Sequence, residues 1–107
     1  MYYRKAVVTN VVDGDTFDAT VDLGFDVFTH QRFRLIGINA PELGTSVGER
    51  SKKALETLFK GKNVVIKSTK PDSFGRYLAD VHLETENGVV KACDYMIETG
   101  NAIFYNK

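Results

Sequence analysis

The stretch TFDATVDL at residues 16–23 alternates apolar and polar side chains without a break. One face of this stretch receives Phe17, Ala19, Val21 and Leu23, and the other receives Thr16, Asp18, Thr20 and Asp22. A period of two residues predicts a β-strand with one buried face. The next residues, Gly24-Phe25-Asp26, predict a hairpin turn into a second strand over residues 27–36. The fold therefore starts from an antiparallel pair of strands.

Further strands and two helices extend this pair in both directions. Segments rich in β-branched and aromatic residues predict strands over residues 4–12, 63–68, 76–84, 89–90 and 102–105. A helix is predicted from Ser46 to about residue 60, because Ser46 and Glu49 fit a capping box and Gly61 suits the position after the helix. Residues 37–47 are predicted as a loop and residues 92–99 as a second helix. In so short a chain, strands joined by hairpins predict a small closed barrel.

Length and composition predict one globular domain over residues 1–107. The chain has 107 residues, of which 43% are apolar and 26% charged. No stretch approaches the about 20 apolar residues of a membrane span, so we expect no membrane partner. We also expect a monomer. The one cysteine, Cys93, excludes an internal disulfide and is expected in the core. No apolar signal sequence follows Arg4 and Lys5, so we expect a cytoplasmic or phage-derived or mobile-element protein, with secretion left open for a longer precursor.

Charge is balanced overall but segregated along the chain. The 14 basic and 14 acidic residues argue against a coat protein that covers nucleic acid through many phosphate contacts. All charged residues between positions 13 and 26 are acidic: Asp13, Asp15, Asp18, Asp22 and Asp26. Between positions 50 and 70 only Glu56 is acidic, against Arg50, Lys52, Lys53, Lys60, Lys62, Lys67 and Lys70. This predicts a basic flank beside an acidic pocket, with a solvated helix face as the simpler alternative.

Three segments carry charged residues that packing does not require. Asp13-Gly14-Asp15-Thr16 places two carboxylates in one turn, and carboxylate oxygens suit a hard cation. Arg34 lies near the end of the predicted strand over residues 27–36, and the loop after this strand carries Asn39 and Glu42. Phe74-Gly75-Arg76 puts a second arginine at the start of a strand, and the planar guanidinium suits a phosphate. The first and third segments alone also fit ordinary turns, and the second fits a surface arginine on a strand with a solvated acid in a loop. Together the three segments supply a cation site, two phosphate contacts and a candidate base.

In this order and spacing, the three segments resemble the staphylococcal nuclease family over about residues 7–105. The resemblance implies an OB-fold, which is a five-stranded Greek-key barrel with two packed helices. It also implies a phosphodiesterase that depends on Ca²⁺ and cuts DNA and RNA, with single strands preferred, leaving 3′-phosphates.

The resemblance implies a set of metal ligands. Asp15 corresponds to the chief carboxylate ligand, Asn39 to the second side-chain ligand and Ala40 to a residue that binds through its backbone carbonyl. Asp13 corresponds to a secondary acid near the metal. Asn39 departs from the family, which usually has aspartate there. Because an amide brings no charge, we expect weaker Ca²⁺ binding than in a typical member.

The resemblance also implies catalytic residues. Glu42 corresponds to the glutamate that positions or deprotonates the attacking water. Arg34 and Arg76 correspond to the two arginines that hold the phosphate and its developing charge. Phe74 replaces a tyrosine of the staphylococcal enzyme and so loses a hydroxyl donor. The aromatic candidates for substrate binding are Phe74, Tyr77 and Tyr105.

The OB-fold also serves proteins without catalytic activity, so a second function stays open. In this alternative the chain is an inactive module that binds single-stranded nucleic acid or a protein partner. The neutral Asn39 favours this alternative, whereas the joint presence of both arginines, Asp15 and Glu42 favours the nuclease. His30 and His82 lie on predicted polar strand faces without ligand spacing, and we expect neither to bind metal.

Overall fold

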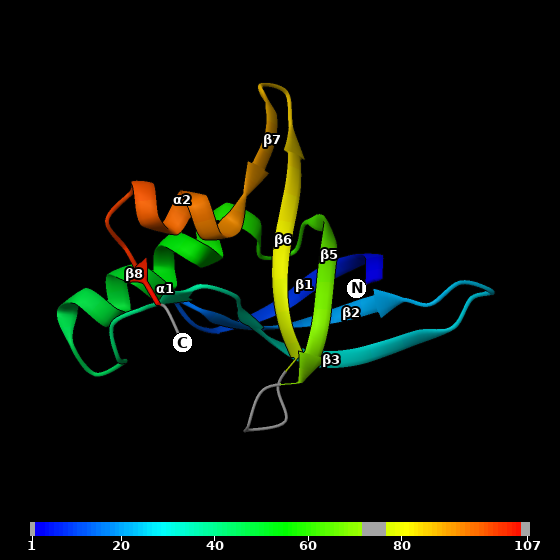
Figure 1. Ribbon diagram of the computed structural model, residues 1–107, viewed down its shortest axis with the longest axis horizontal. Helices are drawn as coiled ribbons and strands as arrows, with labels where there is room; N and C mark the ends of the chain where they lie inside the picture. The colour runs from blue at the N-terminus through cyan, green and yellow to red at the C-terminus, as the bar shows by residue number, and fades with distance from the viewer. Residues whose placement is uncertain (1, 72–76, 106–107) are drawn as a thin grey trace.

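The computed structural model describes residues 2–71 and 77–105 and shows a barrel with two helices (Figure 1). The strands are β1 (Tyr2–Asp13), β2 (Thr16–Asp22), β3 (Phe28–Leu35), β4 (Ile38–Asn39), β5 (Asn63–Pro71), β6 (Tyr77–Thr85), β7 (Gly88–Lys91) and β8 (Ile103–Phe104). The helices are α1 (Ser46–Phe59) and α2 (Ala92–Glu98). Strands pair in the order β3-β2-β1-β5-β6-β7, and β6 also pairs with β3. This extra pairing closes a five-stranded barrel, so the predicted OB-fold with two helices is confirmed.

The pairing that closes the barrel differs from a simple antiparallel meander. β3 and β6 run parallel, with Arg34 opposite Leu78 and Leu35 opposite Ala79. Parallel strands need a long crossover connection, and here the chain passes through α1 and β5 between them. The other barrel pairs are antiparallel, as predicted.

Alternation along the strands builds the core as the sequence predicts. Phe17 of β2 is fully buried, and its ring lies 5.5 Å from that of Phe33 in β3 and 5.1 Å from that of Phe59 in α1. Burying an aromatic ring of this kind contributes about 1.5–3 kcal/mol relative to exposure. The three rings therefore fasten α1 to the barrel.

The N-cap of helix α1 lies one residue earlier than the sequence predicts. The N-cap is Thr45, whose hydroxyl accepts a hydrogen bond from the backbone N–H of Gly48 at 3.0 Å. The predicted Ser46–Glu49 capping box is therefore wrong, because Ser46 already has helical geometry. Gly61 follows the helix with φ +77°, as predicted. None of the helices in the described ranges is long and apolar enough to cross a membrane.

A two-stranded sheet replaces part of the predicted loop over residues 37–47. β4 pairs with β8, with Ile38 opposite Phe104 and Asn39 opposite Ile103. Tyr105 then donates its backbone N–H to the carbonyl of Gly37 at 2.9 Å. A two-residue strand has no periodicity of its own, so the sequence does not reveal it. The pairing brings the C-terminal part of the chain next to Asn39.

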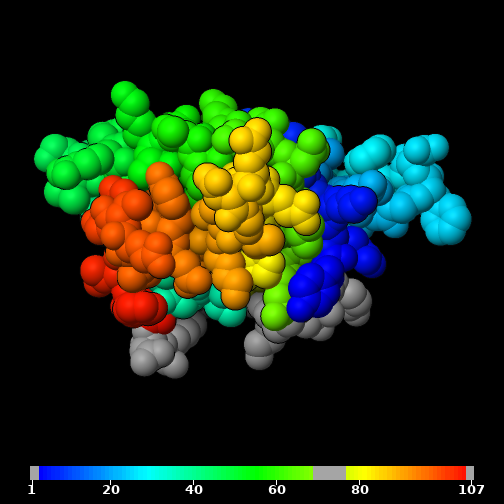
Figure 2. Space-filling model, turned by 90° about the horizontal axis from the view of Figure 1, so that it is seen from above, coloured from blue at the N-terminus to red at the C-terminus, as the bar shows by residue number. Residues whose placement is uncertain are grey.

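The β2–β3 hairpin runs beyond the barrel and projects from it (Figure 2). Leu23 was predicted on the buried face of its strand, but it is 46% exposed. The reason is that the hairpin has left the barrel before this position, so nothing covers its face. Phe25 at the tip is fully exposed.

Cys93 lies half-buried against the core on α2, and its thiol donates to the carbonyl of Ile36 at 3.3 Å. Burial, followed by the charges of Asp80 and Asp94, raises the pKa of Cys93 to about 12. The thiol is thus nearly absent as thiolate at neutral pH, which fits the predicted structural role.

We expect Cys93 to resist alkylation in the folded protein. Only the thiolate reacts, and a pKa near 12 in place of 9.0 lowers its fraction at about pH 8 by roughly two to three orders of magnitude. Reaction with iodoacetamide, followed by mass spectrometry, should be slower by that factor in native buffer than in urea. Equal rates in the two conditions would show that the thiol is not protected.

Candidate active site

Asp15 lies in the turn between β1 and β2 and is 7% exposed. One carboxylate oxygen, Oδ1, accepts from the hydroxyl of Thr16 at 3.0 Å. The other, Oδ2, accepts from the backbone N–H of Ala40 at 2.9 Å and lies 3.6 Å from Nη2 of Arg34. The backbone carbonyl of Asp15 accepts from the N–H of Leu35 at 2.8 Å. These bonds fix the carboxylate against Ala40, the residue that follows β4.

Asp13 and Asp15 share this turn but respond to it in opposite directions. Asp13 accepts from the N–H of Asp15 at 3.1 Å. Burial, and then the side chain of Asp15, raises the pKa of Asp13. Burial also acts to raise the pKa of Asp15, but hydrogen bonds from Asp13, Ala40 and Thr16 and the charge of Arg34 outweigh it and lower that pKa. The turn thus favours the ionised form of Asp15 and disfavours that of Asp13.

Gly14 lets this turn pack closely against α1 and Ala40. A Cβ atom at Gly14 would collide with the hydroxyl of Ser51 and lie 2.8 Å from Cβ of Ala40. Ser51 is fully buried and donates to the carbonyl of Asn101 at 2.7 Å. The sequence analysis missed Ser51 and Thr16 as parts of the site. Ser51 was visible as a polar residue at helical spacing from Ala54 and Leu55.

Arg34 reaches Asp15 because β3 alternates its side chains. Phe33 and Leu35 point into the core, so Arg34 lies on the opposite face, where its side chain is 13% exposed. Its Nη1 donates to the carbonyl of Leu35 at 3.2 Å, and its Nη2 donates to Oδ1 of Asn39 at 3.1 Å. The guanidinium lies 5.4 Å from the ring centre of Tyr105. Arg34 is therefore held on several sides.

Glu42 lies exposed in the loop between β4 and α1. Its backbone is fixed, because its carbonyl accepts from the hydroxyl of Thr45 at 2.8 Å and Gly48 packs directly against it. Its carboxylate forms no hydrogen bond or ion pair with Asp15 or Arg34 in this structure. Among the described residues, no group of three or more His, Cys, Asp and Glu side chains is arranged to hold a metal ion.

The structure thus brings five of the predicted site residues together: Asp13, Asp15, Arg34, Asn39 and Ala40. Tyr105 joins this group through Arg34. Tyr77 packs at 6.1 Å from Phe33 and lines a hollow of about 280 Å³ near Leu23. Arg76 and Phe74 fall outside the described residues. His30 bonds Thr20 and His82 bonds Asp80, and neither contacts the site.

The closed five-stranded barrel with two helices defines an OB-fold domain, and the carboxylate turn held against Arg34 is its candidate site. The chain belongs to the family described as staphylococcal nuclease homologue, whose model matches residues 32–107. The match includes Arg34, Asn39 and Glu42 and begins after the turn with Asp13 and Asp15.

The chain is also similar in sequence to proteins from a bacterium and a plant. The chain is 34% identical to Protein ParB of Escherichia coli over 82 residues, which cover 77% of this chain and 44% of ParB. It is 30% identical to an uncharacterized endonuclease of Escherichia coli O157:H7, over 94% of this chain and 60% of that protein. It is 45% identical to the probable staphylococcal-like nuclease CAN2 of Oryza sativa subsp. japonica over 51 residues, 48% of this chain and 14% of CAN2. The chain therefore spans less than two thirds of each of these relatives.

We expect Gly14→Ala to destabilise the fold by about 1–3 kcal/mol, the usual cost of overpacking a filled site. The added methyl group meets Ser51 and Ala40 with no space to move into. Urea denaturation of Gly14→Ala, Ser51→Ala and the double variant measures this. The double variant should lose less stability than the sum of the two single variants, because Ser51→Ala removes the hydroxyl of the collision. Strict additivity would show that the two residues do not collide.

Proposed function

We propose that this chain is a Ca²⁺-dependent nuclease that hydrolyses phosphodiester bonds of DNA and RNA. The observation that carries the proposal is the pairing of Arg34 with Asp15 at 3.6 Å, both largely buried at one corner of the barrel. A guanidinium held there suits a phosphate, and an ionised carboxylate beside it suits a cation. Membership of the family and the names of the endonuclease and nuclease relatives support the same activity.

The residues present fit a hard, oxygen-binding cation such as Ca²⁺. Asp15, Asn39 and the carbonyl of Ala40 offer a carboxylate, an amide oxygen and a backbone oxygen, all of which Ca²⁺ accepts. Asp15 is ionised, as its lowered pKa indicates. Asp13 would act as a secondary acid. Bound Ca²⁺ would polarise the phosphoryl group and orient water. With one ionised carboxylate and one neutral amide, the affinity should be low.

The remaining roles belong to Glu42 and the arginines. Glu42 is exposed on a fixed backbone two residues after Ala40, and we assign its carboxylate the role of positioning a water molecule and accepting its proton. Arg34 is anchored at Leu35 and Asn39, which orients it toward one phosphate. By its place in the sequence, Arg76 would contribute the second guanidinium. Stabilising charge on the phosphoryl oxygens is the largest contribution expected of these residues.

The substrate is a nucleic-acid strand, and we propose that single strands are preferred. Tyr105 lies against Arg34 and is 44% exposed, so its ring is available for a base next to the bound phosphate. Phe74 and Tyr77 are further candidates from the sequence. We propose that the chain acts as one domain and as a monomer, in the cytoplasm or as part of a phage or mobile element.

We expect cleavage of single-stranded DNA and RNA with millimolar Ca²⁺ and none with a chelator. Arg34→Ala, Arg76→Ala and Glu42→Ala should each lower the cleavage rate by about 10²–10³-fold, as loss of one charge-stabilising group does elsewhere. Gel assays with labelled strands measure the rates, and Asn87→Asp at a hairpin tip serves as the control. Binding of single strands without cleavage under any cation would favour an inactive OB module instead.

Asn39→Asp should lower the Ca²⁺ concentration for half-maximal cleavage by about tenfold, because calcium affinity follows the charge of the ligands. The cleavage rate is measured as Ca²⁺ is titrated. Asn87→Asp adds the same charge elsewhere and should leave the midpoint unchanged. A midpoint that stays or rises in Asn39→Asp would show that residue 39 is not a ligand.

A further inference from the structure

The outer face of the four strands β1, β5, β6 and β7 carries lysines and an exposed tyrosine. Residues along the strands between its side chains, among them Ala6, Ile66 and Val81, are buried in the core, so this face points away from the core. We call it the outer platform. The strand register arranges it in two neighbouring rows: Tyr3, Lys67 and Asp80 in one, and Lys5, Val65, His82 and Lys91 in the other.

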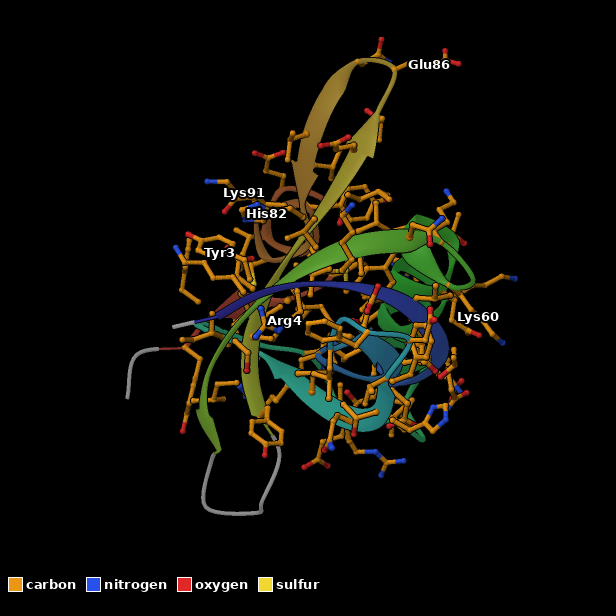
Figure 3. All side chains as sticks on the ribbon, turned by 90° about the vertical axis from the view of Figure 1, so that its right-hand side faces the viewer. Tyr3, Arg4, Lys60, His82, Glu86 and Lys91 are labelled. Carbon is orange, nitrogen blue, oxygen red and sulfur yellow. The ribbon has the colours of Figure 1, made fainter. Side chains whose placement is uncertain are left out.

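The basic and aromatic groups of the outer platform are open to solvent. Tyr3 is 58% exposed, and Lys5 and Lys91 are exposed as well. Tyr3, His82 and Lys91 lie on one side of the barrel in Figure 3. Among the described residues, no carboxylate lies in ion-pair distance of Lys5, Lys67 or Lys91. Their charges are therefore available to a ligand.

Lys67 holds the ring of Tyr3 from one side. Its ammonium nitrogen lies 5.4 Å from the ring centre, a distance at which a cation is attracted to the face of an aromatic ring. Because more than half of Tyr3 is exposed, the other face of its ring is available to a flat partner. The bases of an unpaired nucleic-acid strand stack on aromatic side chains in this way, whatever their sequence.

The acidic groups of this face leave its charge in favour of a polyanion. Asp80 is the one carboxylate in the two rows, and its Oδ2 lies 3.3 Å from Nε2 of His82. Lys67 stands opposite Asp80 in the strand register. Glu84 lies outside the rows, two residues beyond His82 toward the end of β6. The two rows thus carry three lysines against one carboxylate, a balance that attracts phosphates.

Strand β6 connects the outer platform with the candidate active site. Leu78 lies opposite Arg34 in the parallel pairing of β3 with β6. Leu78, Asp80 and His82 alternate with buried residues and so follow one another on the same face. At about 3.3 Å per residue, His82 lies about 13 Å from Leu78 along the strand. A nucleic-acid strand with one phosphate beside Arg34 therefore reaches the platform within a few nucleotides.

We propose that the outer platform binds single-stranded nucleic acid outside the candidate active site, with a base stacked on Tyr3 and phosphates next to Lys5, Lys67 and Lys91. The inference rests on the proposed function, because the ligand is the proposed substrate. It adds a second binding surface, which contributes to the affinity for the strand and not to the chemical step.

The first test is binding of a fluorescently labelled single strand of about 12 nucleotides in EDTA, followed by fluorescence anisotropy. Wild type should bind, and Tyr3→Ala should bind about tenfold more weakly, as loss of one stacked base does elsewhere. Tyr3→Phe keeps the ring and should bind as wild type does. Phe25→Ala is the matched control, since it removes a fully exposed ring from the tip of the β2–β3 hairpin and should have no effect.

The second test is the salt dependence of the same binding. Lys5→Gln and Lys91→Gln should each reduce the slope of log Kd against log salt by about 0.7, the contribution of one phosphate contact in a single strand. Lys60→Gln is the matched control, because Lys60 lies on the opposite side of the barrel in Figure 3, and it should leave the slope unchanged. With Ca²⁺ present, Tyr3→Ala should raise KM for this strand and leave kcat unchanged, because Tyr3 contacts no reacting atom.

Equal binding by wild type and Tyr3→Ala would overturn the inference, and so would equal weakening in Tyr3→Ala and Phe25→Ala. A duplex of the same length that binds as tightly as the single strand would also overturn it. Binding of anionic phospholipid vesicles in place of the oligonucleotide would assign the platform to a membrane instead. Ca²⁺-dependent cleavage with a KM that Tyr3→Ala leaves unchanged would remove the platform and keep the nuclease. The expected affinities in EDTA, with no cleavage under any cation, would support the platform and remove the nuclease.

Discussion

The hydrogen bond from the backbone N–H of Ala40 to Oδ2 of Asp15, at 2.9 Å, holds the candidate site together. It joins the β1–β2 turn to the residue that follows β4, and the N–H of Leu35 secures the same turn through the carbonyl of Asp15 at 2.8 Å. An ionised carboxylate that is almost fully buried is costly unless it is bonded and paired. The hydrogen bonds and the ion pair of Asp15 offset this cost, and the same contacts fix the positions of Arg34 and Asn39.

Two strand pairings far apart in sequence supply those partners. The parallel pairing of β3 with β6 closes the barrel and sets the face on which Arg34 lies. The short β4–β8 pairing places Asn39 beside the C-terminal segment, and Tyr105 is held by the carbonyl of Gly37. The geometry of the site thus depends on both pairings, since no single element carries more than two of its parts.

The sequence predicted the parts of the fold whose signal is local. The alternation around Phe17 and the helical spacing around Leu55 are read directly from neighbouring residues, and both predictions are confirmed. The β4–β8 sheet and the parallel closure depend on hydrogen bonds between distant segments, which leave no periodic pattern. The sequence wrongly predicts that Leu23 is buried. Burial stops where the barrel ends, and the alternating stretch of sequence continues beyond that point. At the site, the sequence named Asp15, but the N–H of Ala40 that fixes it has no side-chain signal.

Substitutions at some site residues test function alone. Substitutions at others also change the stability of the fold. Arg34 compensates the buried charge of Asp15 at 3.6 Å, so its loss leaves that carboxylate with less compensation as well as weakening phosphate binding. Gly14 acts through packing, and Ser51 acts through packing and its hydrogen bond to the carbonyl of Asn101. Asn39 and Glu42 are exposed and interact mainly through one hydrogen bond or a fixed backbone. Changes in binding or cleavage in variants at these two positions can therefore be attributed to the chemistry of the site, because the barrel does not depend on their side chains.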